Sequence, residues 1–494
     1  MSIALINPNL VVQRSDPFTT GVVYMPVTLA YLAAALRQAG REVKVVDAYA
    51  AAPRQRRQDG NFLFFGLTET QVVEQLSQQV EAVFVYAINL TNHLSTVAIV
   101  KAIKSAAPTV PLVVVENTQA VTAYALSQAA GEFYAAGADY ILTGEAEQRA
   151  GQLLDAMAAG ANQETLRSID GLGTPAFYNA PLGFFSQTEL DALPLPAWDL
   201  FPLENYWSLR FAHGPLSARR YLPLLTSRGC PYPCGFCVVP ATNSQKWRPR
   251  SASNVVDEME HFLKTLEVAE FHIEDLDPTI SDTRIRQICV EIVRRGLKVI
   301  WKIAAGTKVE TMRDEETIDL MAKAGCRYIS ISPETGSPRL LKLMRKPFDL
   351  EHAVRLVKRM DQVGIRSQAC FVLGYPGEVE EDLHMTWDLV RTLTRVGVDE
   401  IALFIITPVP GSAISREFSG YSTLSELNFS PAWRKDYAHL NGFRVRLYAH
   451  FLWWKLRYHP RKLLRQPINF LRRRFETKME MVPYRALVLL WLTR

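Results

Sequence analysis

Three cysteines are crowded into one short segment, S-R-G-C-P-Y-P-C-G-F-C, at Cys230, Cys234 and Cys237. Thiolates bind soft metals, and three of them on one tight loop can hold three corners of a four-iron cubane, which normally takes four. The fourth iron would then be open to an external ligand. Two other sites are compatible with this spacing: a structural zinc site completed by His272, and a redox dithiol formed by the last two cysteines.

The other three cysteines lie in apolar, periodic stretches, so we expect Cys289, Cys326 and Cys370 to be small buried residues. No basic and apolar leader opens the sequence, which argues against a disulfide framework and predicts a cytoplasmic protein. No run of 18 apolar residues predicts a membrane-spanning helix. With 494 residues, 48% of them hydrophobic and 21% charged, the chain is expected to fold into two or three domains.

Alternating apolar and amphipathic segments surround the cysteines. Between residues 216 and 415 we predict six strand–helix pairs, which is fewer than the eight of a full barrel and indicates a partial (β/α)6 barrel. The predicted strands are Leu222–Ser227, Glu270–Glu274, Val299–Ala304, Arg327–Ser332, Gln368–Leu373 and Glu400–Ile406. The cysteines follow the first strand, and the carboxyl ends of the strands carry the chemistry in such barrels.

Residues 1–160 show a second alternating series, which predicts a Rossmann-like α/β domain with a parallel sheet and helices on both faces. Predicted strands cover residues 3–8, 42–48, 82–88, 111–117 and 139–144, and predicted helices cover residues 25–40, 69–80 and 95–105. Ligands bind at the carboxyl ends of such strands. These ends carry Asn89, Thr91, Glu116, Asn117, Gly144 and Glu145. The proline-rich residues 161–215 are predicted to be a linker.

The cysteine spacing, with Phe236 before the last cysteine of a barrel-opening loop, resembles the radical S-adenosylmethionine (SAM) superfamily. The segments HIEDLDPTI, ISPETGS, LGYPGE and TPVPGS continue the resemblance on later strands. It implies an oxygen-sensitive [4Fe-4S] cluster on the three cysteines, and SAM cleaved reductively to a 5′-deoxyadenosyl radical. A reductant such as flavodoxin or ferredoxin would supply the electron. The implied SAM-binding residues are Phe236, Glu274, Asp275, Glu334, Gly374 and Gly377.

The segment from Met25 to Ala48 and the GEAE turn resemble radical SAM enzymes with an N-terminal cobalamin-binding domain, the class B methylase-like group. This implies a methylase of an apolar small molecule or lipid, with the six strand-end residues of the N-terminal domain at the corrin pocket. The sequence departs from the group, because it lacks D-x-H-x-x-G and has Glu116–Asn117 where a Gly-Gly pair is usual. His93 follows the third strand, but a satisfied histidine is favoured there over a pocket residue.

These departures leave two alternatives open. One is a radical SAM oxidoreductase, cyclase or dehydratase whose N-terminal domain keeps the fold without a corrin. The other, more remote, is an interaction protein with structural zinc and a tail that binds RNA.

Residues 416–494 are predicted to form a helical region rich in basic and aromatic residues. From residue 441 onward there are 13 Lys and Arg residues against two Glu. Peripheral attachment to the inner face of an anionic membrane, packing on the barrel, and RNA binding would each use them, with RNA disfavoured. Arg444 and Lys455 lie on a different helical side from Arg446 and Arg457, so a clean division into apolar and basic faces is not expected.

Overall fold

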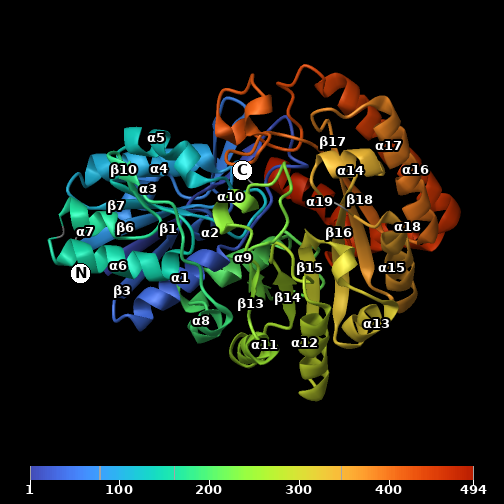
Figure 1. The fold of residues 1–494 in the computed structure, drawn as a ribbon, viewed down its shortest axis with the longest axis horizontal. Coiled ribbons are helices and arrows are strands. Elements are labelled where there is room, and N and C mark those ends of the chain that lie inside the picture. The colour runs from blue at the N-terminus through green and yellow to red at the C-terminus, as the bar shows by residue number, and fades with distance from the viewer. Residues whose placement is uncertain (1, 77–78, 161, 347, 493–494) are drawn as a thin grey trace.

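The N-terminal sheet has seven strands in the order β10-β9-β8-β7-β6-β1-β3. In the computed structural model, which describes residues 2–76, 79–160, 162–346 and 348–492, this sheet lies beside a second one (Figure 1). Its strands are β1 Ser2–Asn7, β3 Glu42–Asp47, β6 Val80–Ala87, β7 Leu112–Glu116, β8 Tyr140–Leu142, β9 Leu172–Thr174 and β10 Phe177–Tyr178. The first five run parallel, and β9 and β10 extend the edge antiparallel.

Helices cover both faces of this sheet, which confirms the Rossmann-like prediction. Ile3 and Leu5 of β1 pack on the face covered by α1 and α6, while Ala4 and Ile6 pack on the face covered by α4 and α5. These helices are α1 Val27–Gln38, α4 His93–Ala106, α5 Leu126–Ala135 and α6 Ala146–Ala158. The predicted helix over residues 69–80 is shorter, α3 Glu69–Glu74, and residues 77–78 lie outside the described residues.

One small antiparallel sheet was not predicted. It has the order β2-β5-β4, with β2 Leu10–Gln13, β4 Arg56–Asp59 and β5 Phe62–Phe65. Its strands are short, and β4 reads R-R-Q-D, which lacks the apolar alternation that marks a strand.

The second sheet has six parallel strands in chain order, β11-β14-β15-β16-β17-β18, as predicted for a partial (β/α)6 barrel. The strands are β11 Tyr221–Leu224, β14 Glu270–Ile273, β15 Ile300–Thr307, β16 Cys326–Glu334, β17 Arg366–Leu373 and β18 Glu400–Ile405. The helices are α11 Ala252–Leu266, α12 Asp282–Arg294, α13 Glu315–Lys323, α14 Pro338–Leu343, α15 Leu350–Val363 and α16 Glu380–Val396. Because β11 and β18 do not pair with each other, the barrel is open between them.

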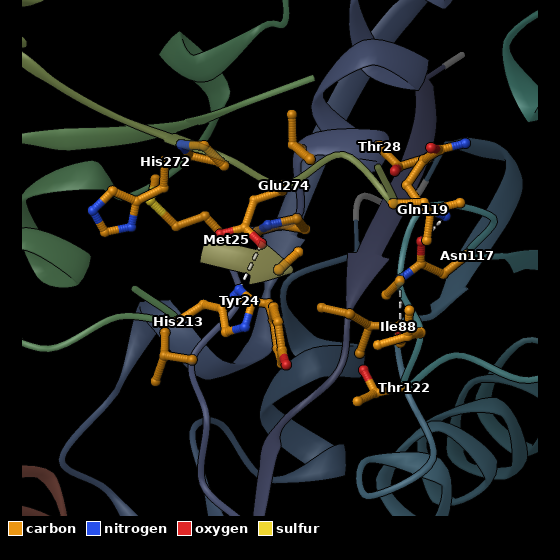
Figure 2. A pocket seen from close by; sticks show the side chains of 18 of the residues that line it. Tyr24, Met25, Thr28, Ile88, Asn117, Gln119, Thr122, His213, His272 and Glu274 are labelled. Carbon is orange, nitrogen blue, oxygen red and sulfur yellow. Dashed lines mark hydrogen bonds and ion pairs between the residues drawn. The ribbon is translucent and has the colours of Figure 1, made fainter. Parts of the chain in front are cut away.

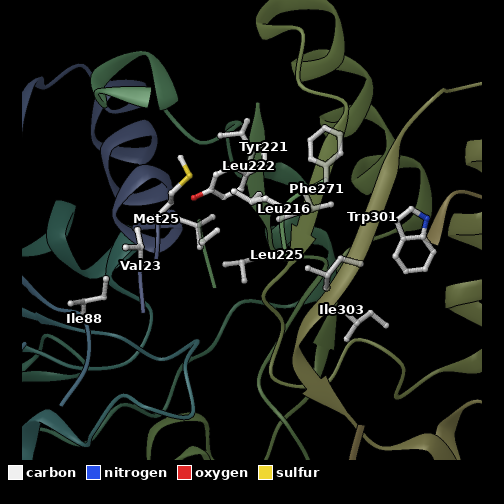
Figure 3. Packing of buried hydrophobic residues seen from close by; sticks show 14 of the residues in the cluster. Val23, Met25, Ile88, Leu216, Tyr221, Leu222, Leu225, Phe271, Trp301 and Ile303 are labelled. Atoms are coloured by element: carbon white, nitrogen blue, oxygen red, sulfur yellow. The ribbon is translucent and has the colours of Figure 1, made fainter. Parts of the chain in front are cut away.

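Further short elements lie within and between these two parts. They are α2 Ala48–Ala51, α7 Gln163–Arg167, α8 Gln187–Ala192, η1 Trp198–Leu200, α9 Leu203–Leu209, β12 Ser227–Arg228, α10 Val239–Asn243, β13 Arg248–Pro249 and η2 Val309–Thr311. One continuous hydrophobic core joins the N-terminal sheet to the barrel. Figure 3 shows part of it, with Val23 and Met25 from the N-terminal side near Tyr221 of β11. The core therefore fixes the two parts against each other.

The C-terminal region is helical, as predicted, and its last helix reaches the open side of the barrel. Its elements are η3 Ser415–Glu417, η4 Leu424–Glu426, α17 Tyr437–Tyr458, α18 Pro460–Arg472, α19 Lys478–Leu487 and η5 Val488–Leu492. The backbone N–H of Phe475 donates to Leu216 O at 2.6 Å, ahead of β11. The N–H of Met479 donates to the Glu400 carboxylate at 2.6 Å, at the start of β18. This segment therefore bridges the two unpaired edges (Figure 1).

Among the described residues, no helix is both long enough and apolar enough to cross a membrane.

Candidate functional site

The cysteine loop is held between two short strands. Arg228 of β12 pairs with Arg248 of β13, which closes the loop at its base. Gly229 has φ +76°, and a Cβ there would lie 1.9 Å from Lys246 O, so only glycine fits. The N–H of Gly235 donates to Met344 O at 2.9 Å, at the end of α14. The loop is thereby fixed against the barrel, at the carboxyl end of β11.

The three thiols share one cavity of about 230 Å³, which we call the chamber. Burial raises the pKa of Cys230 and of Cys237 to about 12, so these thiols stay protonated until a metal displaces the proton. Among the described residues, no three His, Cys, Asp or Glu side chains converge closely enough for a single metal ion. Three thiols on one loop can hold three corners of a cubane, so the chemistry of this donor set suits an iron–sulfur cluster.

A buried ion pair lies in the chamber with the cysteines. Glu334, at the end of β16, has φ +63°, a strained conformation for a residue with a side chain, and it accepts a hydrogen bond from Lys346. Burial raises the pKa of Glu334; burial opposes the charge of Lys346 too, but the nearby carboxylate raises its pKa overall. The Lys346 ammonium lies 5.8 Å from the centre of the Phe236 ring. The predicted residues Phe236 and Glu334 are therefore brought together with the thiols.

Glu274 lies on a second, smaller cavity that adjoins the chamber. Its carboxylate is 2.6 Å from Nδ1 of His213, and the Tyr24 ring packs 4.7 Å from the histidine ring (Figure 2). His213 lines both the chamber and this interdomain cavity. Burial lowers the pKa of His213, which favours the neutral imidazole. A neutral ring donates from Nδ1 to Glu274 and keeps Nε2 as a proton acceptor. Sequence reasoning missed His213, because nothing marks this residue within the linker.

The other three predicted SAM-binding residues line neither the chamber nor the adjoining cavity. Asp275 is fully buried, and its oxygens accept hydrogen bonds from Thr226 and Ser227, so it ties the end of β14 to that of β11. Gly374 and Gly377 line a groove on the outer side, where both adopt positive φ in the turn after β17. The turn needs glycine for its own conformation there.

Apolar side chains and one half-buried lysine also line the chamber. Phe404, Ile406 and Phe429 are among the lining residues. Lys478 enters from α19 and donates to Ala304 O at 2.9 Å. Cys370, predicted to be a core residue like Cys289 and Cys326, instead lines the chamber, because its position on β17 points into the barrel. Lys478 had no signal in the sequence, since it was one of many basic residues in the tail.

Most of the predicted corrin-pocket residues bond within the protein. The Glu116 carboxylate accepts from the N–H groups of Leu126 and Gly144, both at 2.8 Å, which caps α5. Burial raises the pKa of Glu116 to about 7. Asn89 accepts from the hydroxyl of Thr91 at 2.8 Å, and its Oδ1 also accepts from the N–H that follows Thr91. The side-chain amide of Asn117 donates to Ile88 O. Asn117 nevertheless lines the interdomain cavity.

Glu145 serves the contact between the two domains. Its carboxylate lies 2.5 Å from the guanidinium of Arg248, and the neighbouring Glu147 lies 2.5 Å from that of Arg228. All four side chains are buried, so each charge needs its partner to offset the cost of its removal from water. Gly144 has φ +74°, and a Cβ there would lie 2.9 Å from Pro181. Glu145 therefore positions a strand that flanks the cysteine loop, whereas Gly144 leaves room for Pro181.

The space between the domains is small in this structure. The interdomain cavity holds about 70 Å³, which is room for a few water molecules. The segment that follows β7 borders this cavity. Its Thr118 O accepts a hydrogen bond from Asn243 at 2.9 Å, and its Ala125 N donates to Pro410 O at 2.9 Å. Residues of the barrel domain thus hold this segment in place.

The two histidines considered from the sequence both have partners elsewhere. His93 is fully buried, with Nδ1 2.9 Å from the Tyr124 hydroxyl and Nε2 3.1 Å from Glu132. Both ring nitrogens of His93 thus have partners within the protein, as the interpretation of the sequence favoured. His272 lies 3.0 Å from Glu270 and lines the interdomain cavity rather than the chamber. The zinc alternative, which needed His272 beside the cysteines, is therefore not supported by its position.

Comparison with known proteins begins with the barrel. Residues 224–390 match the model of the radical SAM superfamily. Among curated proteins, the chain is 26% identical over 460 residues to cytidylyl-2-hydroxyethylphosphonate methyltransferase of Streptomyces wedmorensis, covering 84% of this chain and 81% of that protein. It is 30% identical over 264 residues to the anaerobic magnesium-protoporphyrin IX monomethyl ester cyclase of Rubrivivax gelatinosus, covering 51% of this chain and 44% of that protein.

Solved structures share the whole arrangement. TsrM from Kitasatospora setae, a radical SAM methyltransferase with cobalamin and a [4Fe-4S] cluster bound, matches with a TM-score of 0.63 at 20% identity, over 86% of this chain and 76% of that chain. OxsB, a cobalamin-dependent SAM radical enzyme with aqua-cobalamin bound, matches with a TM-score of 0.62 at 18% identity, over 91% of this chain and 56% of that chain. At these identities the likeness establishes a common fold.

Proposed function

We propose that this chain, whose barrel matches the radical SAM superfamily, is a cobalamin-dependent methyltransferase that acts on an apolar small molecule or lipid. The observation that carries the proposal is one chamber in which three thiols and the Glu334–Lys346 pair face an apolar wall. The methyltransferase of Streptomyces wedmorensis, which is similar over most of both chains, supports methyl transfer as the reaction class.

Cys230, Cys234 and Cys237 would hold a [4Fe-4S] cluster, with SAM beside Phe236 and Glu334. When bound, the cluster supplies the electron that splits SAM into methionine and a 5′-deoxyadenosyl radical. The carboxylate of Glu334 is suited to accept from the SAM ammonium or ribose hydroxyls. Lys346 neutralises that carboxylate in the meantime, which reduces the cost of keeping it buried. A one-electron donor such as flavodoxin or ferredoxin is required, and we expect a cytoplasmic enzyme.

The substrate would occupy the part of the chamber lined by Phe404, Ile406 and Phe429. These side chains offer apolar contact, and Lys478 offers one half-buried cation. Burial lowers the pKa of Lys478, so this ammonium gains from a polar or anionic partner. These walls suit a molecule with an apolar body and one acceptor group.

His213 is placed to accept a proton from the substrate. Its Nδ1 is oriented by Glu274, so Nε2 is the basic atom. Replacing it in the variant His213→Asn should stop methyl transfer while SAM cleavage continues. Loss of both activities together would instead indicate a structural role.

When bound, cobalamin would carry the methyl group to the substrate, and a second molecule of SAM would supply it, since reductive cleavage leaves the first methyl group on methionine. The solved neighbours bind cobalamin, and this chain shares their fold.

Reaction of the reconstituted enzyme with SAM labelled by deuterium in the methyl group tests the proposal. Lipid extracts and small-molecule extracts of cells that express this chain serve as the source of substrate, and mass spectrometry follows the label. We expect the label in an apolar product only when reductant is present. Production of 5′-deoxyadenosine together with an unlabelled, oxidised or cyclised product would contradict methyl transfer.

A further inference from the structure

Two successive C-terminal helices expose large apolar side chains to solvent. On α17 these are Val445, Leu452, Trp453 and Leu456, with Trp453 58% exposed. The first, second and last of these are separated by seven and four residues, nearly whole numbers of turns, so they form one stripe along the helix. Trp453 lies beside this stripe. An exposed stripe of this kind indicates a surface that is covered by a partner.

Exposed arginines border the stripe on α17. Two other basic residues of this helix point toward the protein instead. Arg446 and Arg457 are exposed beside the stripe. In contrast, Lys455 is 1% exposed and donates to Asp399 O, while Arg444 donates to Phe429 O at 3.0 Å. Basic residues therefore lie on two sides of this helix, as expected, and the exposed side carries the apolar stripe with Arg446 and Arg457.

The next helix repeats the arrangement. On α18, Leu464 is 67% exposed and Leu471 is 81% exposed, with Ile468 between them. Arg461 and Arg472 are exposed along one edge of these apolar residues. The inward side of α18 is used for packing and pairing, as in the contact of Lys462 with Asp361 at 2.6 Å.

We propose that these faces of α17 and α18, the apolar–arginine surface, bind an anionic bilayer. Side chains such as Trp453 and Leu471 would enter the headgroup boundary, and the bordering arginines would meet lipid phosphates. Charge complementarity selects this partner, because a second copy of the chain would bring like charges together. A nucleic acid is a poorer partner, because the apolar stripes would then lie against hydrated phosphates. The inference stands apart from the proposed reaction, but a membrane surface would supply an apolar substrate.

Co-sedimentation of the full chain with vesicles tests this proposal. We expect binding to vesicles of phosphatidylglycerol and phosphatidylcholine, weaker binding to phosphatidylcholine alone, and weakening by salt. The double variant Leu464→Glu/Leu471→Glu should lower the affinity about tenfold or more, and Arg461→Glu/Arg472→Glu should do the same. The matched control is Val290→Glu, which places the same acid at a 53% exposed apolar position on α12 and should bind like the parent chain.

Circular dichroism and SAM cleavage should be unchanged in all these variants, since none of the replaced residues lines the chamber. Equal sedimentation of the parent chain and both double variants would overturn the proposal. So would dimerisation through this surface, seen as a mass in solution that the double variants halve. Tighter binding to RNA than to anionic vesicles would overturn it as well. Because vesicle binding needs no cluster, failure here is distinguishable from failure of the proposed reaction.

Discussion

Lys478 Nζ donates a hydrogen bond to Ala304 O at 2.9 Å, which brings the C-terminal helix α19 into contact with the inside of β15. The lysine enters where β11 and β18 leave the barrel open. Basic residues of the C-terminal region thus have two roles. Lys478 lines the chamber, whereas other basic side chains remain on the surface.

Replacing Lys478 in the variant Lys478→Met should reduce methyl transfer while SAM cleavage is retained. The methionine fills the space but offers no donor to the substrate, and a hydrogen bond to a charged group contributes about 1.5–3 kcal/mol. We expect the ratio of labelled product to 5′-deoxyadenosine to fall about tenfold or more. The exposed Lys435→Met is the control. An unchanged ratio would show that Lys478 only supports the fold.

The Glu334–Lys346 pair should matter for SAM binding beyond its part in folding. Glu334→Gln alone leaves a buried lysine uncompensated, which costs about 3–5 kcal/mol of stability. The double variant Glu334→Gln/Lys346→Met removes both charges and should recover most of that loss. Calorimetric titration of the reconstituted double variant should still show weaker SAM binding. Parent-like affinity would mean that the pair is purely structural.

Much of the fold could be predicted, because its buried parallel strands are continuous apolar runs and the helices between them are amphipathic. The cysteine loop was predictable for the same reason, as it directly follows a strand. The contacts of Lys478 and His213 were not, because each reaches the chamber from a segment distant in the sequence. Asp275 illustrates another limit: it stands at a strand end, but hydrogen bonds to Thr226 and Ser227 use its carboxylate.

Glu116 should make stability depend on pH. Its pKa is raised to about 7 in the folded chain, so the folded state binds a proton more tightly than the unfolded one. Its stabilising contribution is complete below the ordinary carboxyl pKa and is lost as the pH rises through about 7, by up to about 3 kcal/mol. Melting temperatures from pH 5 to pH 8.5 should therefore fall more steeply for the parent chain than for Glu116→Gln. Parallel curves would contradict the assignment.

Restoring glycine after β7 should favour corrin binding. The variant Glu116→Gly/Asn117→Gly removes the bonds to Leu126, Gly144 and Ile88 that hold this strand end. After incubation with hydroxocobalamin and desalting, we expect more retained cobalt than in the parent chain. The control is Asn89→Gly, a glycine substitution at a neighbouring strand end. Saturating cobalt in the parent chain would show that the segment after β7 moves aside.

The cysteine loop carries the central claim, and the test compares Cys230→Ala with Cys289→Ala. Cys230 lines the chamber, whereas Cys289 is buried in the core outside it. After anaerobic reconstitution with iron and sulfide, the parent chain and Cys289→Ala should show cluster absorbance in the visible range. Cys230→Ala should lack most of it.

The most direct measurement is 5′-deoxyadenosine released from SAM by these three proteins under a strong reductant. The parent chain and Cys289→Ala should release it, and Cys230→Ala should release none above background. A parent chain with a full cluster that leaves SAM intact, or a Cys230→Ala variant that cleaves it equally well, would contradict the account.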